Sequence, residues 1–83
     1  MTNAVELAAD LKQRRDDMKR LMGANYKTNS DLYRSVLRNV CADSGVDLAH
    51  AALDIGRKMD EKGIDPSMIF AAFVDESESG ETR

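Results

Sequence analysis

The sequence is poor in the residues that usually carry chemistry. Its 83 residues include one cysteine, one histidine and one proline, and no tryptophan. Cys41 cannot form an internal disulfide alone, and neither Cys41 nor His50 has the companion ligands that a zinc site requires. A Gly-rich phosphate loop and the alternating acidic residues of a calcium loop are also missing. We therefore expect no enzymatic activity, no cofactor and no metal site.

Long hydrophobic runs are missing too. The first residues lack the apolar stretch of a signal peptide. The uninterrupted apolar run from Met68 to Val74 is far shorter than the stretch of about 20 residues that spans a bilayer. We expect a soluble, cytoplasmic protein that does not enter a membrane.

The small size and the composition of the core favour association with a second chain. A chain of this length forms one small domain, in which about 60% of the surface is buried on folding. Five Met residues stand beside only two Phe and two Tyr, which indicates an adaptable and thinly stabilised core. Burying more surface against another subunit would compensate for this weakness.

The charges are unevenly distributed, although the net charge is only −3. Residues 1–38 hold an excess of Lys and Arg, whereas residues 39–83 hold an excess of Asp and Glu. Residues 75–83 are strongly acidic and contain no large apolar residue. This composition is typical of a solvated segment, so we expect residues 75–83 to be a disordered acidic tail.

The first predicted helix is long and amphipathic. Asn3 can cap its start, with Glu6 three residues later completing a capping box, and Gly23 can end it in the left-handed conformation. Apolar residues recur at helical spacing between these ends and form a narrow seam, which Arg14 interrupts with a charge. A seam this narrow is typical of a helix that pairs with another helix. The seam consists of Leu7, Leu11, Met18 and Leu21, with Ala4, Ala8 and Met22 beside it.

The next two helices form a predicted hairpin. The second helix begins between residues 28 and 30, of which we favour Ser30, and ends before Gly45. Asp47 caps the third helix, which contains Gly56. A glycine inside a helix costs about 1 kcal/mol against alanine, so we expect Gly56 to permit close packing against a neighbouring helix.

The boundary before the fourth helix is the clearest in the chain. Gly63 is a typical helix end, and Asp65 followed by Pro66 is a typical start. The apolar run that follows predicts a short helix, packed either into the core of the domain or into a partner, and we favour the core. The sequence thus predicts an all-α, compact four-helix domain over residues 1–74, with a long N-terminal helix, a helical hairpin and a short apolar fourth helix.

The hairpin resembles a helix-turn-helix motif over residues 37–58. Gly45 lies in a tight turn before the helix that Asp47 caps, as the motif requires. The leading residues of the second helix offer no Arg, Lys, Asn or Gln to a base edge, and Asp47 and Asp54 would repel phosphate. Arg57 and Lys58 lie too late in the helix to compensate. Binding to DNA is therefore the alternative hypothesis, and nucleic acid is not the partner that we favour.

The remaining interpretation is a small, non-enzymatic helical module that binds another protein as a regulator, inhibitor or adaptor. We expect this module to form a homodimer, because the seam of the first helix is hard to cover within so small a domain. The identity of any further protein partner is left open. The predicted partner or dimer surface comprises Leu7, Leu11, Arg14, Arg15, Met18, Leu21 and Met22.

Overall fold

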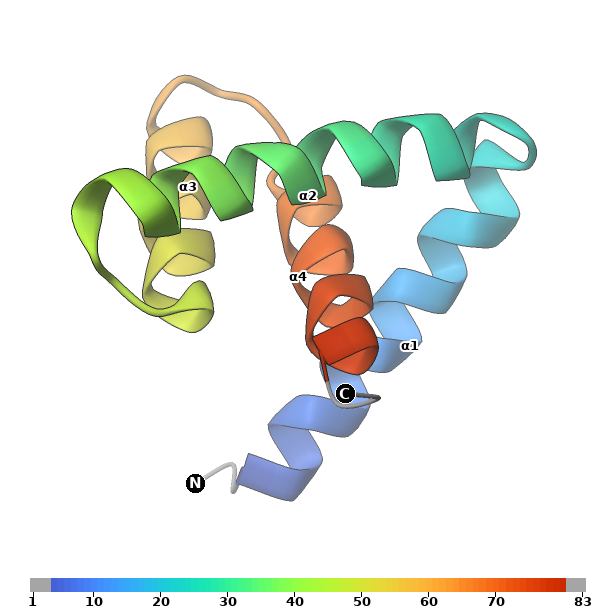
Figure 1. Ribbon diagram of the computed structural model, residues 1–83. Helices are drawn as coiled ribbons and strands as arrows, with labels where there is room; N and C mark the ends of the chain where they lie inside the picture. Colours follow the sequence, from blue (N-terminus) through green and yellow to red (C-terminus); the bar gives the residue numbers. More distant parts are fainter. Residues whose placement is uncertain (1–3, 81–83) are drawn as a thin grey trace.

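The computed structural model describes residues 4–80, which form four α-helices (Figure 1). Helix α1 spans Ala4–Met22, α2 spans Asn25–Ser44, α3 spans Leu48–Glu61 and α4 spans Ser67–Gly80. Helix α4 contacts each of the other three helices. Helices α1 and α3 lie on opposite sides of α4, and over the described residues their backbones do not approach each other closely. The predicted all-α, four-helix domain is confirmed.

Several helix boundaries follow from local signals in the chain. Gly23 adopts a φ of 59° after the end of α1, and Gly45 adopts a φ of 70° after the end of α2. Both angles lie in the left-handed region that residues with a Cβ avoid. Asp47 caps α3, because its side chain accepts a hydrogen bond from the backbone N–H of His50 at 2.8 Å. These predicted boundaries are confirmed, whereas the predicted cap at Asn3 lies outside the described residues.

Helix α2 begins at Asn25, five residues before the predicted start at Ser30. The polar stretch after Gly23 contains no helix-breaking residue, and it delivers Tyr26 to the interior, where 6% of the residue remains exposed. Ser30 is itself buried inside the helix rather than at its start. Burial of one aromatic ring therefore extends α2 over a segment whose composition is typical of a loop.

Helix α4 also extends beyond its predicted end, and residues 75–80 are helical rather than a disordered tail. Their acidic side chains form ion pairs with arginines of α1 and α2, so these charges are not simply solvated. Neutralisation by basic partners stabilises the helical conformation of this polar segment. The last three residues of the expected tail, 81–83, lie outside the described part of the chain.

The core forms where the apolar face of α4 meets the other helices. Leu37 of α2, Ala51 and Ala52 of α3, and Ile69 and Ala72 of α4 make up its main cluster. A second cluster joins Tyr26 to Met68 and Ala71 of α4. The apolar run of residues 68–74 therefore packs inside the domain, as favoured from the sequence.

Gly56 lies where α3 crosses α4, and replacing it with alanine is expected to destabilise the domain. A Cβ at this position would lie 2.6 Å from Cζ of Phe70. Alanine gains about 1 kcal/mol of helix propensity, but overpacking costs about 1–3 kcal/mol, so we expect a net loss of about 1 kcal/mol in the free energy of unfolding. Urea denaturation of Gly56→Ala measures the loss. In a Phe70→Leu background the same change should become neutral or stabilising, and an unchanged loss there would show that the ring is not the obstacle.

Candidate interaction surface

The predicted seam of α1 is divided between two environments. Met18 and Met22 pack against the buried cluster around Tyr26, within the same chain. Leu7 remains 52% exposed and Leu21 81% exposed. Within the seam, Met18 and Met22 are thus covered by the rest of the chain, Leu11 is partly buried, and Leu7 and Leu21 stay exposed.

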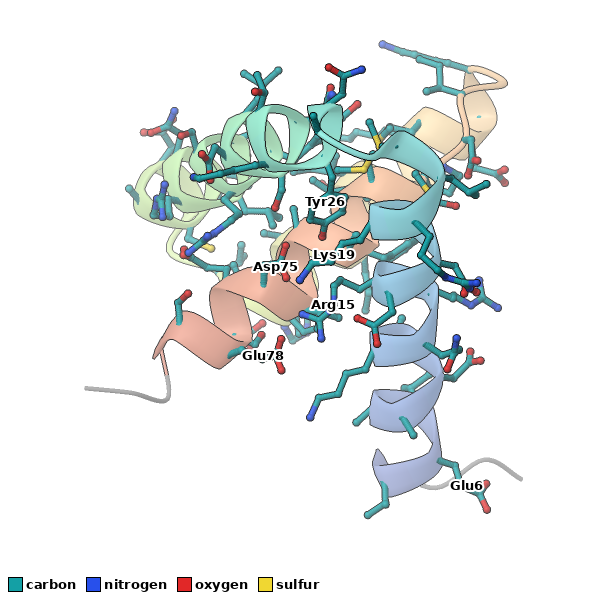
Figure 2. All side chains as sticks on the ribbon, turned by 90° about the vertical axis from the view of Figure 1, so that its right-hand side faces the viewer. Glu6, Arg15, Lys19, Tyr26, Asp75 and Glu78 are labelled. Carbon is teal, nitrogen blue, oxygen red and sulfur yellow. The ribbon has the colours of Figure 1, made fainter. Side chains whose placement is uncertain are left out.

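The two arginines of the predicted surface have different positions. Arg14 lies on the exposed side of α1, and its Nε is 3.3 Å from Oδ2 of Asp10. The Arg15 side chain is only 11% exposed and points toward α4, where it contacts Asp75 and Glu78 (Figure 2). Of the two, only Arg14 is available to a partner at the surface.

An apolar groove lies between the N-terminal half of α1 and helix α3, with α4 as its floor. Its cavity has a volume of about 360 Å³, at the lower end of the range of about 300–1,000 Å³ that is usual for binding pockets. Asp10 and Arg14 stand on the α1 side of the groove. The apolar side chains that line it are Leu7, Leu11, Ala49, Ala52, Leu53, Phe70 and Phe73.

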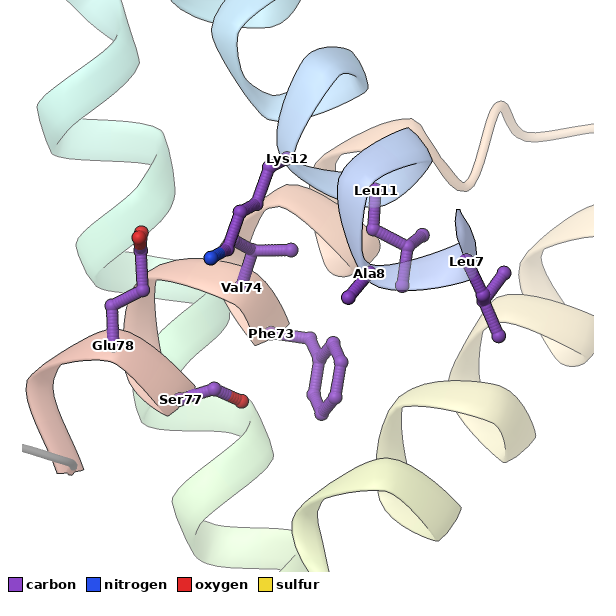
Figure 3. A pocket seen from close by; sticks show the side chains of 8 residues that line it. All are labelled: Leu7, Ala8, Leu11, Lys12, Phe73, Val74, Ser77 and Glu78. Carbon is purple, nitrogen blue, oxygen red and sulfur yellow. The ribbon is translucent and has the colours of Figure 1, made fainter. Parts of the chain in front are cut away.

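A second cavity, of about 320 Å³, adjoins the groove between α1 and the end of α4 (Figure 3). Leu7, Leu11 and Phe73 line both cavities. The Phe73 ring projects toward the space beneath the first turns of α1. Ser77 and Glu78 form the wall at the α4 end. The two cavities therefore make one continuous apolar surface around Phe73.

A buried polar network joins α1, α2 and α4 on another side of the molecule (Figure 2). Asp75 is its centre: one carboxylate oxygen accepts a hydrogen bond from Arg15 at 2.8 Å, and the other accepts from Tyr26 at 2.6 Å and from Ser30 at 2.8 Å. Side chains from three helices thereby share one carboxylate. The network thereby ties both α1 and α2 to α4.

More exposed ion pairs continue outward along α4. Glu76 accepts hydrogen bonds from Arg34 at 3.2 Å and from Arg38 at 2.8 Å. Arg34 also donates to the hydroxyl of Ser79 at 3.0 Å. The Nε atom of Arg34 is buried and has no hydrogen-bond partner among the described residues. None of these residues was singled out as a site from the sequence.

The network perturbs the ionisation of its members. Burial would raise the pKa of Asp75, but the hydrogen bonds from Tyr26, Arg15 and Ser30 outweigh burial and lower the pKa below its ordinary value of 3.8. The hydrogen bond to Glu78 is the main cause that raises the pKa of Arg15, so Arg15 keeps its charge at any ordinary pH. Burial and the bond to Asp75 raise the pKa of Tyr26, so its hydroxyl stays protonated and donates.

These shifts predict that acid weakens the fold. The pKa of Asp75 is lower in the folded chain than in the unfolded chain, so its stabilising contribution is fully present above pH 3.8 and disappears as the pH falls through the folded-state pKa. We expect the free energy of unfolding to fall below about pH 4, and to fall less steeply in Asp75→Asn. Urea denaturation between pH 7 and pH 2.5 measures both slopes. Equal slopes would show that Asp75 does not carry this linkage.

Comparisons with known protein families, with curated proteins and with solved structures found no match. Among residues 4–80, no helix could cross a bilayer, and no cluster of His, Cys, Asp and Glu could hold a metal ion.

Cys41 is partly buried against the main core cluster, and His50 lies on the exposed face of α3 with its Nδ1 atom 2.7 Å from Asp47.

The surface of α3 bears directly on the helix-turn-helix hypothesis. Arg57 donates to Asp54 at 2.7 Å, and the Nζ atom of Lys58 lies 3.3 Å from the same carboxylate. The two basic residues that could contact phosphate are thus engaged by an acidic neighbour. Leu53, which is 62% exposed, lies on the same helix and belongs to the apolar groove.

Proposed function

We propose that the protein is a small, non-enzymatic interaction module of the cytoplasm, which acts as a homodimer and regulates or adapts a protein partner. The apolar groove carries this proposal. Leu7 and Leu53 are half exposed or more, at 52% and 62%, and face a cavity floored by Phe70 and Phe73. A contiguous apolar depression on a small domain is typical of a protein interface.

The proposed occupant of the groove is the N-terminal half of α1 from a second copy. This end of α1 reaches past the body of the domain (Figure 1) and carries Val5, which is 78% exposed, beside Leu7. In a twofold dimer both subunits use the same patch. The exposed end of α1 of each copy would therefore cover the groove of the other copy. Such an arrangement covers the apolar residues of the groove and of the α1 end in both chains at once.

The charges on the groove are compatible with this twofold pairing. Asp10 and Arg14 form an exposed pair on the α1 side of the groove. In the dimer each could exchange its partner for the opposite charge of the second copy, so that no charge is buried unpaired. A polar pair inside an apolar interface would also fix the register of the two helices.

The decisive experiment compares the mass of the wild-type chain with that of Leu7→Asp. Light scattering at micromolar concentration should give twice the 9.2 kDa of one chain for the wild type. Leu7→Asp removes a leucine that the dimer would bury and places a carboxylate in the interface. We therefore expect the dimer Kd to rise by about 100-fold or more. Circular dichroism should show unchanged helix content, because Leu7 is half exposed in one chain.

Leu32→Asp is the matched control. Leu32 is 62% exposed on α2 and does not line the groove, so the same change of chemistry should leave the dimer intact. A wild-type chain that stays monomeric at micromolar concentration would contradict the homodimer. Equal weakening by both variants would place the interface elsewhere.

A further inference from the structure

A basic cleft lies between α1 and α2, away from the apolar groove. Its cavity has a volume of about 440 Å³. Lys19 stands on its α1 side, 5.7 Å above the ring of Tyr26, and Asp31 on its α2 side forms an ion pair with Lys27. The basic residues that line the cleft are Arg15, Lys19, Lys27 and Arg34, and Arg38 lies one turn beyond Arg34.

The end of α4 closes one side of this cleft, which Asp75, Glu78 and Ser79 line. Residues 76–79, which we call the acidic clasp, place Glu76 between Arg34 and Arg38, and Glu78 against Arg15. Asp75, just before the clasp, is held by the buried network and anchors the helix. The clasp therefore presents carboxylates from one helix to arginines of two others.

Several features distinguish the acidic clasp from the rest of α4, which is held by the apolar core. It contains no apolar side chain, and the contacts described for its glutamates are hydrogen bonds and ion pairs. Its glutamates lie near the C-terminal end of α4, where negative charge opposes the helix dipole. The side chains of Arg38 and Glu78 are 56% and 41% exposed, so water and an incoming acidic group can reach these two members of the ion pairs, although Glu76 and Arg34 are only 15% and 23% exposed. The clasp can therefore detach while Asp75 and the core stay in place.

The cleft also has an unused hydrogen-bond donor. The buried Nε atom of Arg34 has no acceptor within residues 4–80, although the other end of its guanidinium contacts Glu76 and Ser79. The clasp thus satisfies this arginine incompletely. A guanidinium can bind a carboxylate through two parallel hydrogen bonds, which a differently placed acidic side chain would provide.

We infer that the basic cleft is a docking site for an acidic helix of a partner protein. In the absence of the partner, the acidic clasp of the same chain takes the place of that helix. The partner helix carries carboxylates at the spacing of Glu76 and Glu78 and displaces the clasp when it binds. The clasp lowers the apparent affinity of the cleft in proportion to the time that it stays closed. This site is separate from the dimer groove and does not depend on dimer formation.

The test uses a fluorescein-labelled, alanine-based helical peptide that carries Glu, Ser, Glu and Ser at the spacing of residues 76–79. Fluorescence anisotropy measures its binding to the full chain and to the Glu76→Gln/Glu78→Gln variant, which opens the clasp but keeps Asp75. A clasp that is closed nine-tenths of the time weakens apparent binding about tenfold, so the variant should bind about tenfold more tightly than the wild type. The single variant Glu76→Gln should give a smaller gain in the same direction.

Two matched controls separate the cleft from general charge attraction. Adding Arg34→Gln and Arg38→Gln to the open variant should abolish binding, whereas adding Arg57→Gln, on α3, should not. A peptide with Gln in place of Glu should not bind. The inference fails if the open variant, with helix content unchanged by circular dichroism, binds the acidic peptide no more tightly than the wild type. It also fails if inorganic polyphosphate displaces the peptide at equal charge concentration, because the cleft would then bind any polyanion.

Discussion

Replacing Asp75 with alanine is expected to lower the free energy of unfolding by about 3 kcal/mol. The change would leave Arg15, Tyr26 and Ser30 without the acceptor that they share. The side chains of Arg15 and Asp75 are 11% and 14% exposed, so water cannot easily replace the carboxylate. Groups that stay buried after losing a partner keep their full desolvation cost, which makes the loss larger than the net value of the hydrogen bonds. Urea denaturation followed by circular dichroism measures the change.

Asp31→Ala provides the matched comparison for this prediction. Asp31 also pairs with a basic residue, Lys27 at 2.8 Å, but its side chain is 52% exposed. Its removal should change the free energy of unfolding far less than Asp75→Ala does. Equally small effects of both substitutions would mean that the buried network contributes no more than a surface pair.

Ending the chain after Val74 is expected to cost at least as much as Asp75→Ala, about 3 kcal/mol or more. The truncation removes Asp75 together with the ion pairs of Glu76 and Glu78. The composition of this segment alone predicts a loss within about 0.5 kcal/mol, as for a solvated end. Thermal and urea unfolding of the truncated chain therefore distinguish a packed helix end from a tail.

The control for this truncation is a chain that ends after Gly80. It keeps the whole of α4, so its stability should stay within about 0.5 kcal/mol of the full chain. A similar small effect of both truncations would restore the interpretation of residues 75–83 as a dispensable tail.

The parts of the fold that could be predicted depend on neighbours in sequence. Gly23 and Gly45 mark helix ends because only the local backbone angle matters there, and Asp47 caps α3 through an N–H three residues away. Gly56 could be predicted to lie at a close helix contact, because a glycine inside a helix lowers its stability and close packing can offset that loss. These signals require no knowledge of the rest of the chain.

The parts that could not be predicted depend on distant partners. Asp75 is 60 residues from Arg15 and 49 from Tyr26 in the sequence. Composition alone therefore predicts that its carboxylate is solvated. One signal was present, since Asp75 and Glu78 continue the helical spacing of Ala71 and Ala72. That spacing indicates a shared face, but it does not identify the arginine that meets it.

Dependence on distant partners also explains why one part of the predicted surface of α1 is buried and another part is exposed. Arg14 was expected to be the charged interruption of the seam, whereas the neighbouring Arg15 is the residue that α4 buries. A helix turns by about 100° per residue, so two adjacent arginines face different surroundings. Which of the two enters the interior depends on the angle at which α4 crosses α1, and no local pattern encodes that angle.

The central position of α4 has a consequence for how the chain folds as it is made. Ribosomes synthesise proteins from the N-terminus, so α1, α2 and α3 emerge before residues 67–80. During that interval Leu37 and Ala52 lack Ile69 and Ala72, against which they pack, and Arg15 lacks Asp75. Helix α2 contacts both α1 and α3, but α1 and α3 do not contact each other directly among residues 4–80. The nascent chain must therefore expose its apolar faces until α4 leaves the exit tunnel, and assembly of the core then follows as one cooperative step.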